Sequence, residues 1–415
     1  MKTTDVILTI GLIIGAGLVA YPVGAFLRLP YMLVLVGAGA LLGSSVLDVI
    51  DVPLASTGEQ VLLTLGVSFI LFNGGLHLSM RVLRQVAFGL GMLVIPGVIL
   101  TAIICGLVAA LVFDVPVTTG LLIGAVLAPT DPAILIPLFR RMGLRPKLEQ
   151  TIVAESALND PTGAVLALTF LGVVITNDSL GAGPVLDFAK ELGISAGLGI
   201  VFGVVLSLAV SHSRLGVWRE SSGIAVLAMV TLTFFTVGEA GAQSGYLGPF
   251  IAGLIVGNMD QLGLGMHSDH ERDMRSLVSN LSDIMVIFVF VILGANLPFR
   301  AIADNWLPAL AVLAVLILIA RPLVVLLCLV PDRRGGWTRE ELVFMAWTRE
   351  TGVVPAALAG IVVSRGVAHG ELVVVTVAMA ILLTLGLQAS TKGWLARRLG
   401  LIDPAAAAAL EEAEH

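Results

Sequence analysis

Long apolar runs separated by short polar segments make up almost the whole chain. Because about 20 apolar residues are needed for a helix to cross a bilayer, this pattern predicts about thirteen membrane-spanning helices. They run over Val6–Leu27, Tyr31–Leu47, Gln60–Leu78, Val86–Phe113, Thr118–Leu138, Leu148–Ile175, Asp187–Ser211, Gly223–Val237, Gly245–Asn258, Leu277–Leu297, Trp306–Val330, Leu342–Val363 and Leu372–Leu395. The predicted fold class is therefore an all-α polytopic membrane protein.

Two of the predicted helices carry a polar interruption near their middle. The fifth contains APTDP, residues Ala128–Pro132, and the twelfth contains TRETGVVP, residues Thr348–Pro355. Proline has no backbone N–H, so carbonyl groups near each break lose their helical partners and become free to bind a cation. Breaks at matching positions of two halves are typical of inverted-repeat transporters, whose discontinuous helices cross at the membrane midplane. We expect that architecture here.

The sixth predicted helix contains a polar stretch, AESALNDPTG, at residues Ala154–Gly163. Ionisable residues inside a membrane are costly, and they usually mark an ion or proton pathway. Ser156 and Asp160 are four positions apart and share one helix face, so both can present oxygen atoms to one alkali cation. No second basic residue remains to neutralise Asp160, which makes this carboxylate the candidate carrier of cation and proton.

The remaining charged residues near the breaks have predicted supporting roles. Glu155 and Asn159 share the neighbouring face of the sixth helix, and we expect Arg349 to form an ion pair with Glu155 and to hold the Asn159 carbonyl. Asp131 has two compatible interpretations: it caps a half-helix, or it balances the positive ends of the broken helices.

Several further polar residues keep more than one interpretation. Asn73 either lines the ion path or is a packing amide, and Glu350 either assists at the cavity or caps a half-helix. Arg321 is expected to lie near its helix end and to extend its side chain toward the interface. His267 and His270 lie in a predicted polar connector, Gln261–Arg275. They suggest a pH sensor, although a solvated cytoplasmic loop is the favoured interpretation of this connector.

Composition and charge agree with a membrane protein. The chain has 415 residues, of which 57% are hydrophobic and 13% charged, with a mean hydropathy of +1.02. Most of the 23 Lys and Arg residues, Lys392 included, fall in alternate loops, which the positive-inside rule places in the cytoplasm. We therefore expect an inner-membrane protein with its N-terminus outside and its C-terminus inside. The net charge of −6 gives no sign of a nucleic-acid partner, and Cys105 and Cys328 are expected to be packing residues.

The motifs place the chain near a known group of transporters. APTDP, ESALND, SGYLGPFIAGLIVGN and the arginine-bearing break occur in that order, and the chain in this respect resembles the monovalent cation/proton antiporter superfamily. Within its first branch it is most similar to the bacterial and archaeal sodium/proton antiporters. The resemblance implies a site that binds cation and proton in turn at Asp160, Ser156 and Thr130. It also implies a supporting charge network of Asp131, Glu155, Asn159 and Arg349.

The resemblance further implies a domain organisation and a coupling mode. The family fold is a homodimer with a dimerisation part, roughly residues 1–80 and 223–300, and a mobile core, roughly 84–176 and 304–398, joined by a linking helix at 185–212 and followed by a short cytoplasmic tail at 399–415. The adjacent Asn159 and Asp160 are similar to the pair of the electroneutral subgroup. Two departures leave the choice between sodium and potassium open: Asn73 stands where many relatives have Glu, and Arg-Glu-Thr-Gly replaces Arg-Gly-Ala-Val.

The predicted function is exchange of one monovalent cation for one proton at Asp160, by an elevator-like shift of the core. The transported ions are Na⁺, or alternatively K⁺ or Li⁺, and H⁺; no cofactor is expected, and the partners are membrane lipids and a second copy of the chain. The alternatives are a potassium/proton antiporter and a sodium-coupled organic-anion carrier, the latter disfavoured because the polar groups are mostly oxygen ligands. An intramembrane protease using Asp131 and Asp160 is disfavoured because no GxGD-type sequence surrounds either residue, so we do not expect an enzyme.

Overall fold

The structure is a computed structural model that describes residues 3–27, 29–43, 46–50, 57–131, 139, 142–176, 182–211, 217–218, 220–240, 245–264 and 268–403. Pro132 with the rest of the predicted fifth helix, His267 and the tail beyond residue 403 lie outside these residues. The elements are α1 Thr3–Leu27, α2 Tyr31–Leu42, α3 Thr57–His77, α4 Met80–Gln85, α5 Ala87–Met92, η1 Leu93–Gly97, α6 Val98–Phe113, α7 Val117–Leu127, α9 Pro146–Thr176, α10 Ala182–Val210, α11 Ser222–Glu239, α12 Leu247–Gly257, η2 Met259–Leu262, α13 Ser268–Ala295, α14 Phe299–Val315, η3 Leu316–Ala320, α15 Arg321–Leu329, α16 Arg339–Trp347, α17 Val353–Ser364, α18 Gly370–Leu383, η4 Thr384–Ala389 and α19 Ser390–Arg398.

Helices account for nearly all of this described structure. Nine helical stretches among the described residues are long and apolar enough to cross a membrane, and α2, α7, α12 and α17 are shorter apolar helices. Each of the thirteen predicted helices therefore has a counterpart, and the prediction of an all-α multi-pass membrane protein is confirmed.

One predicted connector is partly helical. The prediction placed a polar connector over Gln261–Arg275, whereas α13 already begins at Ser268. Glu271 and Arg275, one helical turn apart, form an ion pair of 2.8 Å that stabilises this first part of α13. Arg275 also donates to the carbonyls of Leu76 and Gly257, so it binds the carboxyl ends of α3 and α12.

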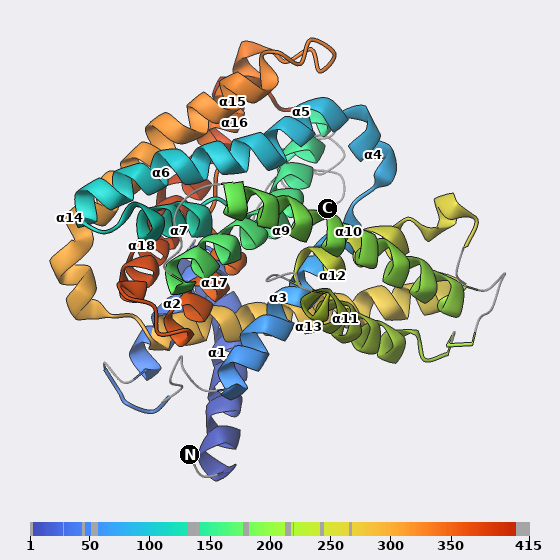
Figure 1. The fold of residues 1–415 in the computed structure, drawn as a ribbon, viewed down its shortest axis with the longest axis horizontal. Helices are drawn as coiled ribbons and strands as arrows, with labels where there is room; N and C mark the ends of the chain where they lie inside the picture. Colours follow the sequence, from blue (N-terminus) through green and yellow to red (C-terminus); the bar gives the residue numbers. More distant parts are fainter. Residues whose placement is uncertain are drawn as a thin grey trace.

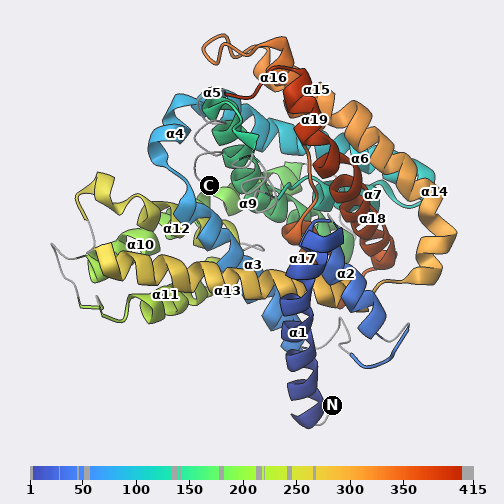
Figure 2. The same ribbon diagram turned by 180° about the vertical axis from the view of Figure 1, so that it is seen from behind.

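The helices pack in two groups around α9 (Figure 1). In one group, α3 packs on α12 and α13, α10 packs on α12, and α13 packs on α2. In the other, α6, α7, α14, α17 and α18 contact one another. Figure 2 shows from behind that α13 runs across the molecule past α3 and α17. It also shows that α1 extends away from the other helices, with the N-terminus near its far end. The helix α9 contacts members of both groups, which places its polar stretch at their junction.

Glycine allows α3 and α12 to approach closely. A Cβ atom at Gly253 would lie 2.1 Å from the carbonyl oxygen of Phe72, and one at Gly75 would lie 2.1 Å from that of Phe250. No larger side chain fits at either position unless the backbones separate, and such small residues are the usual basis of tight helix packing in lipid. The pair α3 and α12 is therefore a close backbone contact beside the polar stretch of α9.

In the part of the chain that the structure describes, three long spans contain a π-helical segment: η1, η3 and η4. Pro96 lies inside η1, and Pro322 follows η3 by two residues. Because a proline ring collides with the carbonyl of the residue four positions earlier, a wider turn accommodates it. The segment η3 lies in the middle of the span Phe299–Leu329, so Arg321, the residue directly after it, is inside the membrane part of the protein rather than at its edge.

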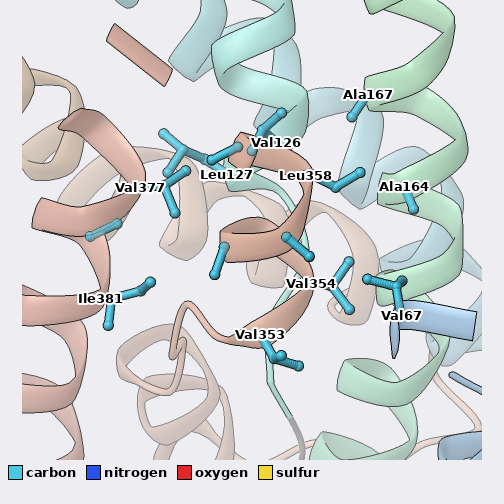
Figure 3. Packing of buried hydrophobic residues seen from close by; sticks show 14 of the residues in the cluster. Val67, Val126, Leu127, Ala164, Ala167, Val353, Val354, Leu358, Val377 and Ile381 are labelled. Atoms are coloured by element: carbon cyan, nitrogen blue, oxygen red, sulfur yellow. The ribbon is translucent and has the colours of Figure 1, made fainter. Parts of the chain in front are cut away.

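Apolar side chains surround α17 (Figure 3). Val354 and Leu358 of α17 are fully buried, as are Val126 of α7, Ala164 of α9 and Val377 of α18. They belong to one continuous hydrophobic cluster. This packing fixes the helix whose first residue follows the second break, and so fixes the frame around the polar site.

Candidate functional site

The two breaks predicted from the sequence meet in space. After α7 ends at Leu127, residues Ala128–Asp131 are not helical, and residues 348–352 separate α16 from α17. The backbone N–H of Asp131 donates to the carbonyl of Glu350 at 3.0 Å. One hydrogen bond therefore joins the two interrupted segments directly.

Each break is capped by a charged side chain from the other. The Arg349 Nη2 donates to the carbonyls of Leu127 and Ala128, both at 2.8 Å, at the carboxyl end of α7. The Asp131 Oδ2 accepts from the N–H of Val353 at 3.1 Å, at the amino end of α17. A cation at a carboxyl end and an anion at an amino end both oppose the helix dipole, and they satisfy backbone groups that lipid cannot hydrate.

Thr130 connects the first break to α9. Its N–H donates to Asn159 Oδ1 at 3.0 Å, and its hydroxyl accepts from Asn159 Nδ2 at 2.8 Å. The same hydroxyl then donates to Ser156 Oγ at 2.9 Å. The structure thus brings the predicted ligands Thr130 and Ser156 together. It also corrects the expected role of Asn159. Both polar atoms of the Asn159 amide bind Thr130, whereas the expected partner of this side chain was Arg349.

Asp160 lies close to this network without a cationic partner. The side chain is buried, its Oδ1 has no hydrogen-bond partner, and none of the four ion pairs among the described residues includes it. An unsatisfied buried acceptor costs about 1–3 kcal/mol, and more when it is charged. A proton or a small cation would satisfy this oxygen, and the nearby hydroxyls offer the oxygen ligands that alkali cations prefer.

A cavity of about 580 Å³ leads to the site between α3, α9 and α13. Asp131 and Asp160 lie at its lining, together with Asn73, Asp283 and the exposed His77. Asn73 is therefore on the cavity wall, and its Oδ1 is buried without a hydrogen-bond partner. Acidic side chains that line a water-filled cleft concentrate cations in it.

The expected pairing of Glu155 with Arg349 is wrong. Glu155 forms a two-pronged ion pair with Arg321, in which Nη2 donates to Oε2 at 2.9 Å and Nη1 donates to Oε1. The Arg321 Nε also donates to the carbonyl of Met345 at 3.0 Å, at the end of α16. Arg321 is available for this role because η3 precedes it in mid-span, whereas the sequence interpretation placed it near a helix end.

Glu350 also differs from both of its predicted roles. It does not line the cavity, and among the described residues its side chain forms no hydrogen bond that caps a helix. Instead it forms an ion pair with Lys392, in which both side chains are fully buried. The sequence interpretation had assigned Lys392 to a cytoplasmic loop, whereas it lies in α19, inside the continuous span Gly370–Arg398.

Sequence reasoning therefore missed Arg321, Lys392 and Asp283. A signal existed for Lys392, since Thr384, Gln388, Thr391 and Lys392 repeat at helical spacing within an otherwise apolar run. A basic residue in line with three other polar residues faces the protein interior more often than lipid. Arg321 carried no such local pattern.

Comparisons with known proteins identify the family. The family model described as "Sodium/hydrogen exchanger, transmembrane" matches residues 12–398. The chain belongs to the sodium/hydrogen exchanger family. This is a family of transporters, and the resemblance inferred from the motifs is confirmed.

Individual relatives carry names for both sodium and potassium. A "Probable Na(+)/H(+) antiporter 2" of Methanocaldococcus jannaschii is 28% identical, covering 79% of this chain and 78% of the relative. A "K(+)/H(+) antiporter NhaP2" of Shewanella sp. (strain MR-4) is 30% identical and covers 85% of this chain. The match spans only 59% of that relative's length.

A solved structure shows the same fold. The sodium proton antiporter MjNhaP1 from Methanocaldococcus jannaschii, determined at pH 8, superimposes with a TM-score of 0.83 at 25% identity, over 95% of this chain and 99% of that one. The family and fold together support cation/proton antiport as the general class of activity.

The Glu155–Arg321 pair predicts non-additive losses of stability. Glu155→Ala or Arg321→Ala alone leaves an uncompensated buried charge, at an expected cost of about 3–5 kcal/mol, and the double variant should lose less than the sum of the singles. The melting temperature of purified protein in detergent measures this. The cycle of Glu155→Ala with Arg349→Ala is the control and should be closer to additive. Equal additivity in both cycles would contradict the pairing.

Gly352 predicts a specific sensitivity at Asp131. A Cβ atom at residue 352 would lie 2.0 Å from Asp131 Oδ2 and 2.1 Å from its Cβ, so Gly352→Ala must displace that carboxylate. We expect cation/proton exchange in vesicles to fall more than tenfold, since small displacements of a binding group have effects of that size. Gly91→Ala, at a position with open space, should retain activity. Wild-type exchange by Gly352→Ala would show that the position of Asp131 is unimportant.

Proposed function

We propose that this protein exchanges one Na⁺ for one proton at a single site built around Asp160. The observation that carries the proposal is the buried Asp160 Oδ1, which has no hydrogen-bond partner and lies at the lining of a cavity. Cation and proton compete for this carboxylate, with Ser156 and Thr130 as the further oxygen ligands of the cation. Competition for one site couples the two fluxes, because the site carries either ion but not both.

The surrounding charges support a stoichiometry of one to one. Glu155 is neutralised by Arg321, and Glu350 is neutralised by Lys392. Arg349 and Asp131 oppose the dipoles of two helix ends, and their formal charges cancel. Among the described buried charges near the two breaks, Asp160 is left as the side chain whose charge is not balanced. One proton therefore leaves when one monovalent cation binds, and the exchange is electroneutral.

Transport further requires the site to face each side of the membrane in turn. In our proposal the core, residues 84–176 and 304–398, moves in an elevator-like manner against a dimerisation part, residues 1–80 and 223–300, of a homodimer in the inner membrane. The cavity opens near the end of α3 and the start of α9, close to the basic positions Arg81, Arg84 and Lys147. By the positive-inside rule this side is cytoplasmic, so the described state faces inward.

Potassium is the second candidate cation. Relatives named as K(+)/H(+) antiporters are about as similar to this chain as those named for sodium. The cavity also presents the Asn73 amide, which adds no negative charge at a position where the motif comparison expects Glu. An anionic substrate is disfavoured, because Asp131, Asp160 and Asp283 all line the cavity and would repel it.

The direct test is proton flux across everted membrane vesicles with a pH-sensitive dye, with sodium, lithium and potassium chloride added separately. We expect sodium or lithium to dissipate the pH gradient in vesicles with the wild-type protein. Asp160→Asn should abolish the response to every cation, because it removes the exchangeable charge from the site.

Asp283→Asn is the matched control, since it also neutralises a cavity carboxylate but leaves Asp160 unchanged. It should retain cation-dependent flux, with at most a weaker apparent affinity. Flux near the wild-type level in folded Asp160→Asn would contradict the single-site proposal. A response to potassium alone would replace sodium as the substrate without changing the site.

A further inference from the structure

We infer that Lys392 and Glu350 are positioning residues for cation binding, at one end of a polar stripe on the last helix that holds the second break in place. The inference rests on the proposed function and deepens it, because it names the residues that set the geometry of the site without touching the cation. The stripe consists of Thr384, Gln388, Thr391 and Lys392, from η4 and α19.

Every member of the stripe binds the segment at the break. The Thr384 hydroxyl accepts from the N–H of Thr351 at 3.1 Å, and Gln388 Nε2 donates to the carbonyl of Trp347 at 2.8 Å. The Thr391 hydroxyl accepts from Trp347 Nε1 at 2.9 Å. The first two contacts satisfy backbone groups at the break, and the third holds the Trp347 side chain. Together they fix residues on both sides of Glu350.

Lys392 contributes a charged contact, its ion pair with Glu350. Both side chains are fully buried, and Lys392 Nζ also lies 5.7 Å from the centre of the Phe139 ring. A lysine in such surroundings is retained only where its charge is paired, because burial of an isolated ammonium group costs several kcal/mol. The Glu350 carboxylate is thereby held to one place beside α19.

Glu350 transmits this position to the cation site through its backbone. Its carbonyl accepts the N–H of Asp131 at 3.0 Å, and the Asp131 carboxylate caps α17 through Val353. A shift of residue 350 must therefore shift Asp131 and, with it, the adjacent Thr130. Thr130 is a proposed ligand of the cation, so the ion pair determines a ligand position from outside the cavity.

A simple structural role predicts a different outcome from a positioning role. Lys392→Met and Glu350→Gln each strand one polar partner, so either single change lowers stability. The double variant Glu350→Gln/Lys392→Met removes both charges, and replacement of a buried pair by neutral residues often restores stability. If the pair only supports the fold, the double variant regains both stability and cation affinity. If the pair positions the break, stability returns but cation affinity does not.

The experiment measures sodium-dependent proton flux in proteoliposomes over a range of sodium concentrations, together with the melting temperature in detergent. For Glu350→Gln/Lys392→Met we expect a melting temperature near that of the wild type and a half-saturating sodium concentration about tenfold higher, as for a displaced binding group. The control is Glu341→Gln/Lys147→Met. It removes an ion pair of 3.1 Å at the other end of α16 and should leave half-saturation unchanged.

A wild-type half-saturating concentration in the double variant overturns the inference. Should the double variant fail to fold, Thr384→Val tests the same stripe, because it removes the acceptor for the Thr351 N–H without creating a charge; it should also raise half-saturation, and an unchanged value overturns the inference equally. A wild-type protein that shows no cation-dependent flux overturns the proposed function itself. The two failures are therefore distinguishable.

Discussion

Two helix breaks inside a membrane create the constraint on which the rest of the site depends. Backbone groups at the ends of α7, α16 and α17 have no helical partner, and lipid cannot supply one. The protein satisfies them with side chains: Arg349 binds the end of α7, Asp131 binds the start of α17, and Arg321 binds the end of α16. Three of the buried charged side chains near the two breaks therefore bind backbone groups at helix ends.

This arrangement explains how a charged site is tolerated in an apolar surrounding. Glu155 and Glu350 have basic partners, and the two charges at the helix ends oppose dipoles. Asp160 is the exception, and its position beside hydroxyl groups and an open cavity allows an ion from solution to supply the missing charge. The proposed function follows from this one uncompensated charge, because the other buried charges near the two breaks are neutralised or oppose helix dipoles.

The sequence predicted the helices and both breaks because hydrophobic runs and prolines are local signals. It also predicted that Ser156 and Asp160 act together, since their spacing places them on one face of α9. It did not predict the partner of Glu155, because the choice between Arg321 and Arg349 depends on which unpaired carbonyl groups each arginine reaches after folding. The π turn η3 and the burial of Lys392 are likewise consequences of long-range packing, for which spacing along the chain gives little information.

The central claim is that one unbalanced carboxylate carries the exchange, and the dependence of transport on membrane potential tests it most directly. Purified protein in proteoliposomes is given a fixed sodium gradient while potassium and valinomycin set the potential to inside-negative, zero or inside-positive. Replacement of one proton by one monovalent cation moves no net charge, so the initial rate of proton flux should be equal at the three potentials. A rate that changes systematically with potential would contradict the account, since a second charge would then have to move or titrate during the cycle.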